Sequence, residues 1–204
     1  MKFNIITPLA RFENFEKLKN SLRKHNIVWH ILVDQGTNHQ IEEDEWINVY
    51  VCPNQGSDFW VRCNNAINWF VENFEPLENE YYGILNDDDN YEENFFEKIK
   101  NKFTENNNPE LIIVSMLRGN KIPTDVVPIR RHPTTPLLAD SRNMRVGGVG
   151  VEQFFIKGNL LKKHKIPLTA HGDGEFVVEL VKNYKTTYLS DCFVLFNYFE
   201  PGRW

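Results

Sequence analysis

Short apolar runs separated by helix-like segments are the feature that most constrains the fold of this chain. Runs rich in Ile, Val and aromatic residues at 2–7, 27–33, 47–52 and 81–85 predict four strands. Each run stops at polar or turn-forming residues. Strands of this kind, with helical segments between them, are typical of α/β proteins rather than of sandwiches or bundles.

The segments between these runs carry helical periodicity. The first helical pattern consists of Phe12, Phe15, Leu18 and Leu22. A second helical pattern follows Asp58, a residue type that favours the N-cap, and reaches Phe70. The resulting β-α-β-β-α-β order predicts a mainly parallel sheet whose ligands lie beyond the carboxyl ends of its strands.

The second half of the chain is less regular. We expect strands at 111–117, 149–156 and 187–196, and a helix at 174–184. The segment 118–145 is rich in proline and basic residues and has no clear periodicity. A connection of that length inside a compact domain indicates a functional loop or lid, or else a disordered segment.

Bulk properties limit the class of protein. A chain of 204 residues suits one domain better than two. The formal net charge of -5 disfavours broad attraction to nucleic acid. No apolar run approaches the roughly 20 residues that span a bilayer, and no signal-peptide pattern precedes the first strand, so we expect a cytoplasmic protein. The cysteines lack the spacing of a zinc site or disulfide framework; they are Cys52, Cys63 and Cys192.

Three consecutive carboxylates follow the strand at 81–85 directly. Asp87, Asp88 and Asp89 repel one another unless a cation or a set of donors neutralises them. Mg²⁺ or Mn²⁺ suits such oxygen ligands, and completes its shell with water and substrate phosphates. The alternative is a solvated acidic turn that caps a helix beginning near Glu92.

Four short segments carry a resemblance to a known family. They are Ile5-Ile6-Thr7-Pro8, Leu32-Val33-Asp34, Arg62-Cys63-Asn64-Asn65-Ala66-Ile67 and Leu85-Asn86-Asp87-Asp88-Asp89. In this order they resemble the GT-A fold of nucleotide-sugar-dependent glycosyltransferases, particularly the inverting family 2 enzymes. The resemblance covers nearly the whole chain. It implies one α/β GT-A domain over 1–204, with a nucleotide-sugar-binding half at 1–90 and an acceptor-binding half at 91–204.

The resemblance also implies roles for individual residues. The metal, Mn²⁺ or Mg²⁺, would lie at Asp88 and Asp89. Asp173, in an element similar to the acidic motif at the head of the family's penultimate helix, would take the proton of the acceptor hydroxyl. Otherwise Asp173 or Glu175 merely stabilises the first turn of that helix. The donor, a UDP-sugar, would be bound by Thr7, Pro8, Arg11, Asp34, Asn64 and Asp87.

Two positions depart from the family pattern. Asn86 stands where the family's metal motif begins with Asp, and Asn197 stands near the end of the last strand where members often place a His ligand. Both changes alter the expected metal site.

Several candidates have a plain alternative. Asp34 is also a normal turn residue, and Arg11 either contacts the diphosphate or is a solvated charge. Three basic residues of the long loop either close over the diphosphate, bind an anionic acceptor or form an exposed basic turn; they are Arg130, Arg131 and His132. Gly147 and Gly148 would let the backbone approach a sugar closely, or simply mark the entry to a strand.

The sequence therefore predicts a metal-dependent inverting glycosyltransferase acting on a hydroxyl of a glycan, a protein or a modified nucleobase. The first alternative is a nucleotidyltransferase of similar core, although the segment after the first strand lacks the expected glycine-rich basic loop. The second is a non-catalytic module that binds a sugar or nucleotide. Release of the donor's sugar in the presence of Mn²⁺ would separate an enzyme from such a module.

Overall fold

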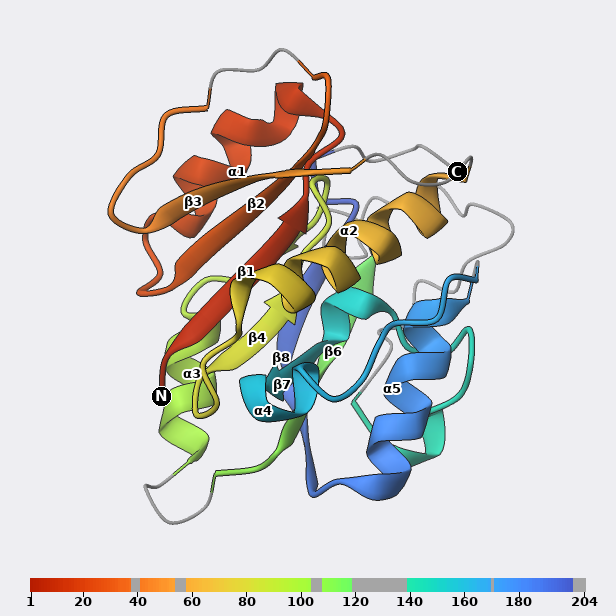
Figure 1. Ribbon diagram of the computed structural model, residues 1–204. Helices are drawn as coiled ribbons and strands as arrows, with labels where there is room; N and C mark the ends of the chain where they lie inside the picture. The colour runs from red at the N-terminus through yellow and green to blue at the C-terminus, as the bar shows by residue number, and fades with distance from the viewer. Residues whose placement is uncertain (38–40, 54–57, 104–107, 119–138, 170, 200–204) are drawn as a thin grey trace, which may run out of the picture.

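A single eight-stranded sheet forms the centre of the protein (Figure 1). The structure is a computed structural model and describes all residues except 38–40, 54–57, 104–107, 119–138, 170 and 200–204. The strand order is β3-β2-β1-β4-β7-β6-β8-β5. The strands are β1 (Phe3–Pro8), β2 (Val28–Asp34), β3 (Ile47–Cys52), β4 (Tyr81–Ile84), β5 (Asn90–Tyr91), β6 (Leu111–Arg118), β7 (Phe154–Lys157) and β8 (Thr186–Phe196).

The sheet is mixed but mainly parallel. β1, β2, β3 and β4 pair in parallel, and so do β6 and β8. β7 runs antiparallel between β4 and β6, and β5 runs antiparallel to β8 at the edge. The expected fold class, an α/β domain with a mainly parallel central sheet flanked by helices, is therefore confirmed.

Helices cover both faces of the sheet, and alternating strand residues fill the two cores. α1 and α3 pack on one face, where the core contains Phe3, Ile5 and Phe155. α2, α4 and α5 pack on the other, where the core contains Ile6 and Phe154. The helices are α1 (Phe15–Leu22), α2 (Phe59–Phe74), α3 (Phe95–Lys102), α4 (Gly158–Leu161) and α5 (Gly172–Asn183), with short 3-10 helices η1 (Phe12–Asn14), η3 (Ser141–Asn143) and η4 (Val151–Gln153).

The predicted start of α2 is confirmed in detail. The Asp58 carboxylate accepts a hydrogen bond of 2.9 Å from the backbone N–H of Trp60, which satisfies one of the free donors at the helix start. Ala66, Ile67 and Phe70 then face the sheet. The helix thereby carries Arg62 and Cys63 to the carboxyl ends of β1 and β2.

Two local predictions were wrong. The expected strand at 149–156 begins only at Phe154, because Gln153 bonds locally instead of joining a ladder. Its side chain accepts from the backbone N–H of Gly150 and donates to the carbonyl of Val114, which stabilises η4. The two-residue strand β5 was not expected. The proposed lid at 118–145 lies mostly outside the described residues, and the division at residue 90 stays a prediction.

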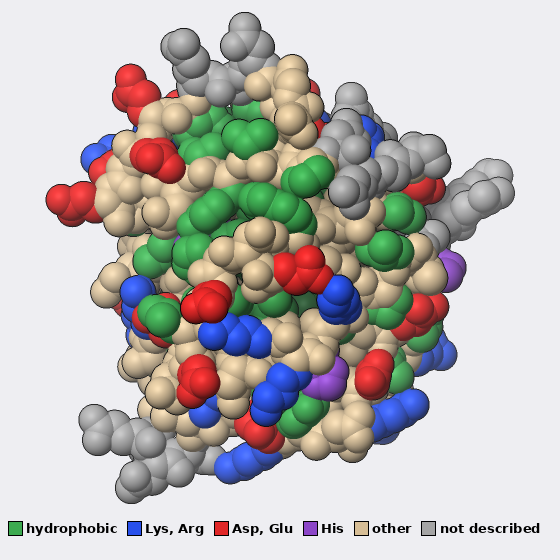
Figure 2. All heavy atoms as spheres, viewed as in Figure 1, with side chains coloured by type: hydrophobic (Ala, Val, Ile, Leu, Met, Phe, Trp, Pro, Cys, Tyr) green, Lys and Arg blue, Asp and Glu red, His purple; other side chains and the backbone are tan. Residues whose placement is uncertain are grey.

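The surface agrees with the composition. On the face shown in Figure 2, Lys and Arg side chains are interspersed with Asp and Glu, in keeping with the formal net charge of -5. Within the part of the chain that the structure describes, no helix is long and apolar enough to cross a bilayer.

We expect Gly83→Ala to destabilise the protein by about 1–3 kcal/mol, as overpacking does. The added Cβ would lie 2.4 Å from the Phe155 ring, which is opposite Gly83 in the β4–β7 pair. That ring cannot move aside easily, because it packs among the rings of Phe3, Tyr91, Phe95 and Phe96.

Urea unfolding of both single variants and of Gly83→Ala with Phe155→Leu provides the test. The shorter leucine leaves room for the new methyl group, so the double variant should lose less stability than the two single losses combined. Strict additivity would contradict the contact.

Candidate functional site

Two adjoining hollows open at the edge of the sheet where the parallel strands end. We call one the Asp34 hollow; it is lined by Pro8, Leu9, Ala10, Phe12, Leu32, Asp34, Thr37, Phe59, Arg62, Cys63 and Ala66. We call the other the Asp173 hollow; it is lined by Trp60, Cys63, Asn64, Ile67, Asn86, Met116, residues 147–152, His171, Asp173 and Phe196. Each has a volume of about 220 Å³, so together they reach the size of an ordinary ligand site, roughly 300–1,000 Å³.

The Asp34 hollow combines an apolar floor with one ion pair. Pro8 and Leu32, at the ends of β1 and β2, lie in the floor. On the rim, a carboxylate oxygen of Asp34 lies 3.7 Å from a guanidinium nitrogen of Arg62, and both side chains are about one third exposed. A flat apolar group would fit the floor, and the rim offers both an acceptor and donors to its polar edge.

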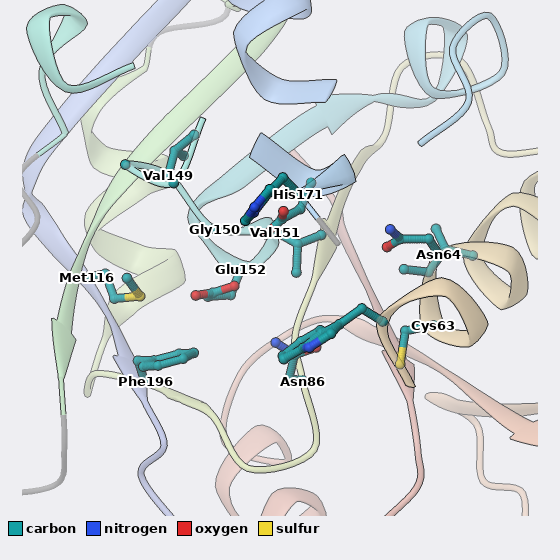
Figure 3. A pocket seen from close by; sticks show the side chains of 15 residues that line it. Cys63, Asn64, Asn86, Met116, Val149, Gly150, Val151, Glu152, His171 and Phe196 are labelled. Carbon is teal, nitrogen blue, oxygen red and sulfur yellow. The ribbon is translucent and has the colours of Figure 1, made fainter. Parts of the chain in front are cut away.

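The Asp173 hollow is built from segments far apart in the sequence (Figure 3). α2 supplies Cys63 and Asn64, and the ends of β6 and β8 supply Met116 and Phe196. Because β7 runs antiparallel, the segment leading into it, residues 147–152, reaches the same edge at which the parallel strands end.

Asp173 lies in the first turn of α5 and faces this hollow. Burial raises the pKa of its carboxyl, and hydrogen bonds from the backbone N–H groups of Gly174 and Val151 work in the opposite direction. A raised pKa makes an ionised carboxylate a stronger base. Glu175, its neighbour on the helix, is not among the residues that line the hollow.

Glu152 is the second carboxylate of this hollow, and the sequence prediction missed it. Its side chain is only 3% exposed, and its carboxylate lies so close to Gly150 that a Cβ there would be 2.5 Å from Oε1. In Figure 3 it lies between Met116 and Asn86. The available signal was a charged residue inside the expected strand 149–156, where the only other polar side chain is Gln153.

Asp89 lies behind Glu152 and is fully buried. Burial, then the charges of Glu152 and Asp88, raise the pKa of Asp89 well above its usual range. One oxygen of Asp89 accepts from the backbone N–H of Asn197 at 2.7 Å. Its other oxygen has no hydrogen-bond partner among the described residues.

Asp87 and Asp88 are held by Arg11. Asp87 Oδ2 accepts from the backbone N–H groups of Ala10 and Arg11, at 2.8 and 2.6 Å. Asp87 Oδ1 accepts from Nε of Arg11 at 2.6 Å and also from its Nη2. Asp88 Oδ2 accepts from Nη1 of Arg11 at 2.7 Å. Donors from the protein, one of them cationic, therefore neutralise the carboxylates that the sequence assigned to donor and metal.

The expected divalent metal does not fit this donor set. Both oxygens of Asp87 and one oxygen of Asp88 already face donors, and Asp89 is buried below the surface of the hollow. Among the described residues, no three His, Cys, Asp or Glu side chains are grouped so that they could hold a metal ion. The prediction of a metal at Asp88 and Asp89 is therefore not supported by the arrangement of these side chains.

The end of β8 does meet the carboxylates, as the resemblance implied, but through its backbone. The N–H of Asn197 contacts Asp89, and the N–H of Phe199 donates to the Asp88 carbonyl at 3.0 Å. Asn197 has a positive φ of 53°, which turns the chain at this point. Asn86 contributes to the lining of the Asp173 hollow.

The remaining predicted residues fall into three groups. Pro8 and Asp34 line one hollow, and Asn64, Gly147, Gly148 and Asp173 line the other. Thr7 is fully buried, and its hydroxyl accepts from the Trp29 indole at 2.9 Å, so its side chain points away from both hollows. Arg130, Arg131 and His132 lie outside the described residues.

Cys63 lines both hollows and so marks where they meet. Burial, with the charges of Asp87 and Asp34, raises the pKa of its thiol to about 12. At neutral pH it is a thiol rather than a thiolate, so it is not an activated nucleophile.

Comparisons with known proteins give likenesses of fold only. No protein-family model and no curated protein matches the sequence. Among solved structures, a 4-diphosphocytidyl-2C-methyl-D-erythritol synthase is 12% identical, with a TM-score of 0.49 over 93% of this chain and 89% of that one. The 2-C-methyl-D-erythritol 4-phosphate cytidylyltransferase of Francisella tularensis is 13% identical, with a TM-score of 0.41 over 80% and 76%. At these scores neither likeness decides the reaction.

We expect Asp87→Asn to cost about 3 kcal/mol, the scale for breaking a buried ion pair. The Asp87 side chain is 1% exposed and accepts from two backbone N–H groups and from Arg11. The amide keeps the volume but turns one acceptor oxygen into a donor that faces other donors.

Asp140→Asn is the matched control, because Asp140 pairs with Arg142 at the surface and accepts its backbone N–H as well. Urea unfolding should show little change for this variant, as for most exposed pairs. A loss of stability in Asp87→Asn as small as the one expected for this control would contradict a structural role for the Arg11–Asp87 contact.

Proposed function

We propose that this protein is a glycosyltransferase that moves a sugar, with inversion, from a nucleoside diphosphate donor to an acceptor hydroxyl. One observation carries the proposal: two hollows of different chemistry adjoin at the carboxyl edge of the sheet and share Cys63. Open α/β sheets bind their ligands at that edge. The hollow with the Asp34–Arg62 ion pair suits a nucleoside, and the hollow with the two carboxylates of Glu152 and Asp173 suits a sugar and its acceptor.

In the proposed complex, the nucleoside occupies the Asp34 hollow. The base packs on Pro8 and Leu32, while Asp34 accepts from a ribose hydroxyl or a base N–H. Arg62 keeps Asp34 in place and offers a donor to a base carbonyl. UDP is the nucleotide that the family resemblance favours, and the diphosphate points toward the Asp173 hollow.

The transfer itself is assigned to the Asp173 hollow. Asp173 takes the proton of the acceptor hydroxyl as its oxygen attacks the anomeric carbon, and the bond from that carbon to the diphosphate breaks. The nucleoside diphosphate leaves with the bonding electrons. Glu152 is the competing base, because its carboxylate lines the same hollow. The Mn²⁺ or Mg²⁺ expected from the sequence has no step in this proposal.

Nucleotidyl transfer is the second candidate, because the two similar structures are a 4-diphosphocytidyl-2C-methyl-D-erythritol synthase and a cytidylyltransferase. That reaction must hold a triphosphate and usually uses Lys or Arg for it. Among the described lining residues of the Asp173 hollow there is no Lys or Arg, whereas Glu152 and Asp173 are acidic. This charge favours a neutral sugar over a triphosphate there.

A thermal-shift panel with UDP, UDP-sugars and CTP tests the proposed function. A ligand that binds only the native state raises the melting temperature by mass action. UDP and at least one UDP-sugar should do so, and Asp34→Ala should remove the shift. Asp44→Ala is the control, because Asp44 precedes β3 and so lies at the amino ends of the parallel strands, away from the two hollows.

Product analysis then separates the reactions. Release of UDP from a UDP-sugar supports glycosyl transfer. Release of pyrophosphate from CTP would contradict glycosyl transfer and support nucleotidyl transfer instead. Binding without turnover of any donor would indicate a non-catalytic module.

We expect Asp173→Asn to lower sugar transfer by about 10²–10⁴ while leaving UDP affinity nearly unchanged, the usual effect of removing a general base. Glu152→Gln is the parallel variant, and Glu175→Gln is the control on the same helix as Asp173. Steady-state rates with a working acceptor, together with calorimetry of UDP binding, provide the measurement.

Loss of transfer in Glu152→Gln with near-normal transfer in Asp173→Asn would move the role of base to Glu152. Normal rates in both variants would remove the Asp173 hollow from the mechanism.

A further inference from the structure

We infer that Arg11 takes the place of the divalent cation in this protein, so that nucleotide binding does not require a metal. Three aspartates at the end of a strand need a compensating cation or donors, and the sequence suggested Mg²⁺ or Mn²⁺. The structure supplies a guanidinium there instead. The part of this inference that concerns nucleotides rests on the proposed function.

The contacts show that the guanidinium is held from several directions. Nε and Nη2 of Arg11 donate to Asp87, and Nη1 donates to Asp88, so the one cation bridges two carboxylates. Its own backbone N–H also donates to Asp87. The side chain is 20% exposed, against 1% for Asp87 and 10% for Asp88. Arg11 therefore covers the two carboxylates on the solvent side.

Charge strengthens the arrangement. Burial works against ionisation of Arg11, but hydrogen bonds and charges from Asp87 and Asp88 outweigh it and leave the pKa of Arg11 raised. Burial raises the pKa of Asp88, and the nearby Arg11 opposes that rise. Arginine stays charged at any physiological pH, so this cation does not leave by losing a proton.

A divalent ion would have to displace this guanidinium. Mg²⁺ and Mn²⁺ need carboxylate oxygens of their own, and here those of Asp87 are occupied and one of Asp88 is bonded to Nη1. Displacement would break the bonds from Arg11 to Asp87 and Asp88, and breaking a largely buried ion pair is costly. The carboxylates thus serve to hold Arg11, whose positive charge acts on Cys63, the residue that both hollows share.

The first measurement uses the metal alone. Electron paramagnetic resonance of Mn²⁺ should show no stoichiometric binding by the unmodified protein. Arg11→Ala uncovers Asp87 and Asp88 and should gain a Mn²⁺ site. Arg142→Ala removes an arginine from a surface Asp–Arg pair and should gain none. Stoichiometric Mn²⁺ binding by the unmodified protein that is lost in Asp88→Asn would overturn the inference, and this comparison stands even if Arg11→Ala does not fold.

The second measurement is calorimetry of UDP binding in EDTA and in MnCl₂. We expect affinities that agree within about twofold, and a loss of about tenfold or more in Arg11→Lys, which keeps the charge but loses the planar fork of donors that contacts Asp87 and Asp88 together. An affinity for UDP that is tenfold or more higher in MnCl₂ than in EDTA would overturn the inference. If UDP binds in neither buffer, the proposed function fails, and the Mn²⁺ measurement decides the role of Arg11 by itself.

Discussion

Compensation of three adjacent carboxylates after β4 is the constraint on which the arrangement of this site depends. The Asp87 side chain points to the segment after β1, where it accepts hydrogen bonds from the Arg11 side chain and from two backbone N–H groups. Asp89 turns the other way, to the N–H of Asn197 at the end of β8. Asp88 joins the two sides, through its side chain to Arg11 and through its carbonyl to Phe199. Segments that are distant in the sequence are thus tied to one short turn.

The reversed strand β7 determines the chemistry of the second hollow. A parallel strand presents the residues that follow it to this edge, whereas β7 presents those that precede it. The segment 147–152 therefore forms a wall of the Asp173 hollow and brings Glu152 beside Asp89. Glycine at 150 permits this, because any larger residue would meet the Glu152 carboxylate.

The strands and helices of the first half could be predicted from the sequence because local patterns decide them. Apolar runs define β1, β2, β3 and β4, and Asp58 begins α2 as a capping residue does. Strand order also predicted the edge at which Asp34 lies, whereas Asn64 and Asp173 were expected there from the family resemblance. The partner of the Asp triplet did not, since nothing local distinguishes an arginine that binds phosphate from one that binds carboxylates. η4 was missed because its stability comes from the side chain of Gln153 reaching β6.

The position of Cys63 has a consequence for the durability of the site under oxidative stress. A sulfur atom where the two hollows meet would, if oxidised, place a bulky polar group between the Asp34 hollow and the Asp173 hollow. Oxidants react with thiolates, and the neighbouring carboxylates and burial keep this sulfur protonated. The other two cysteines, Cys52 and Cys192, are fully buried. The same negative charge that Arg11 balances therefore also protects the junction of the two hollows from a chemical lesion.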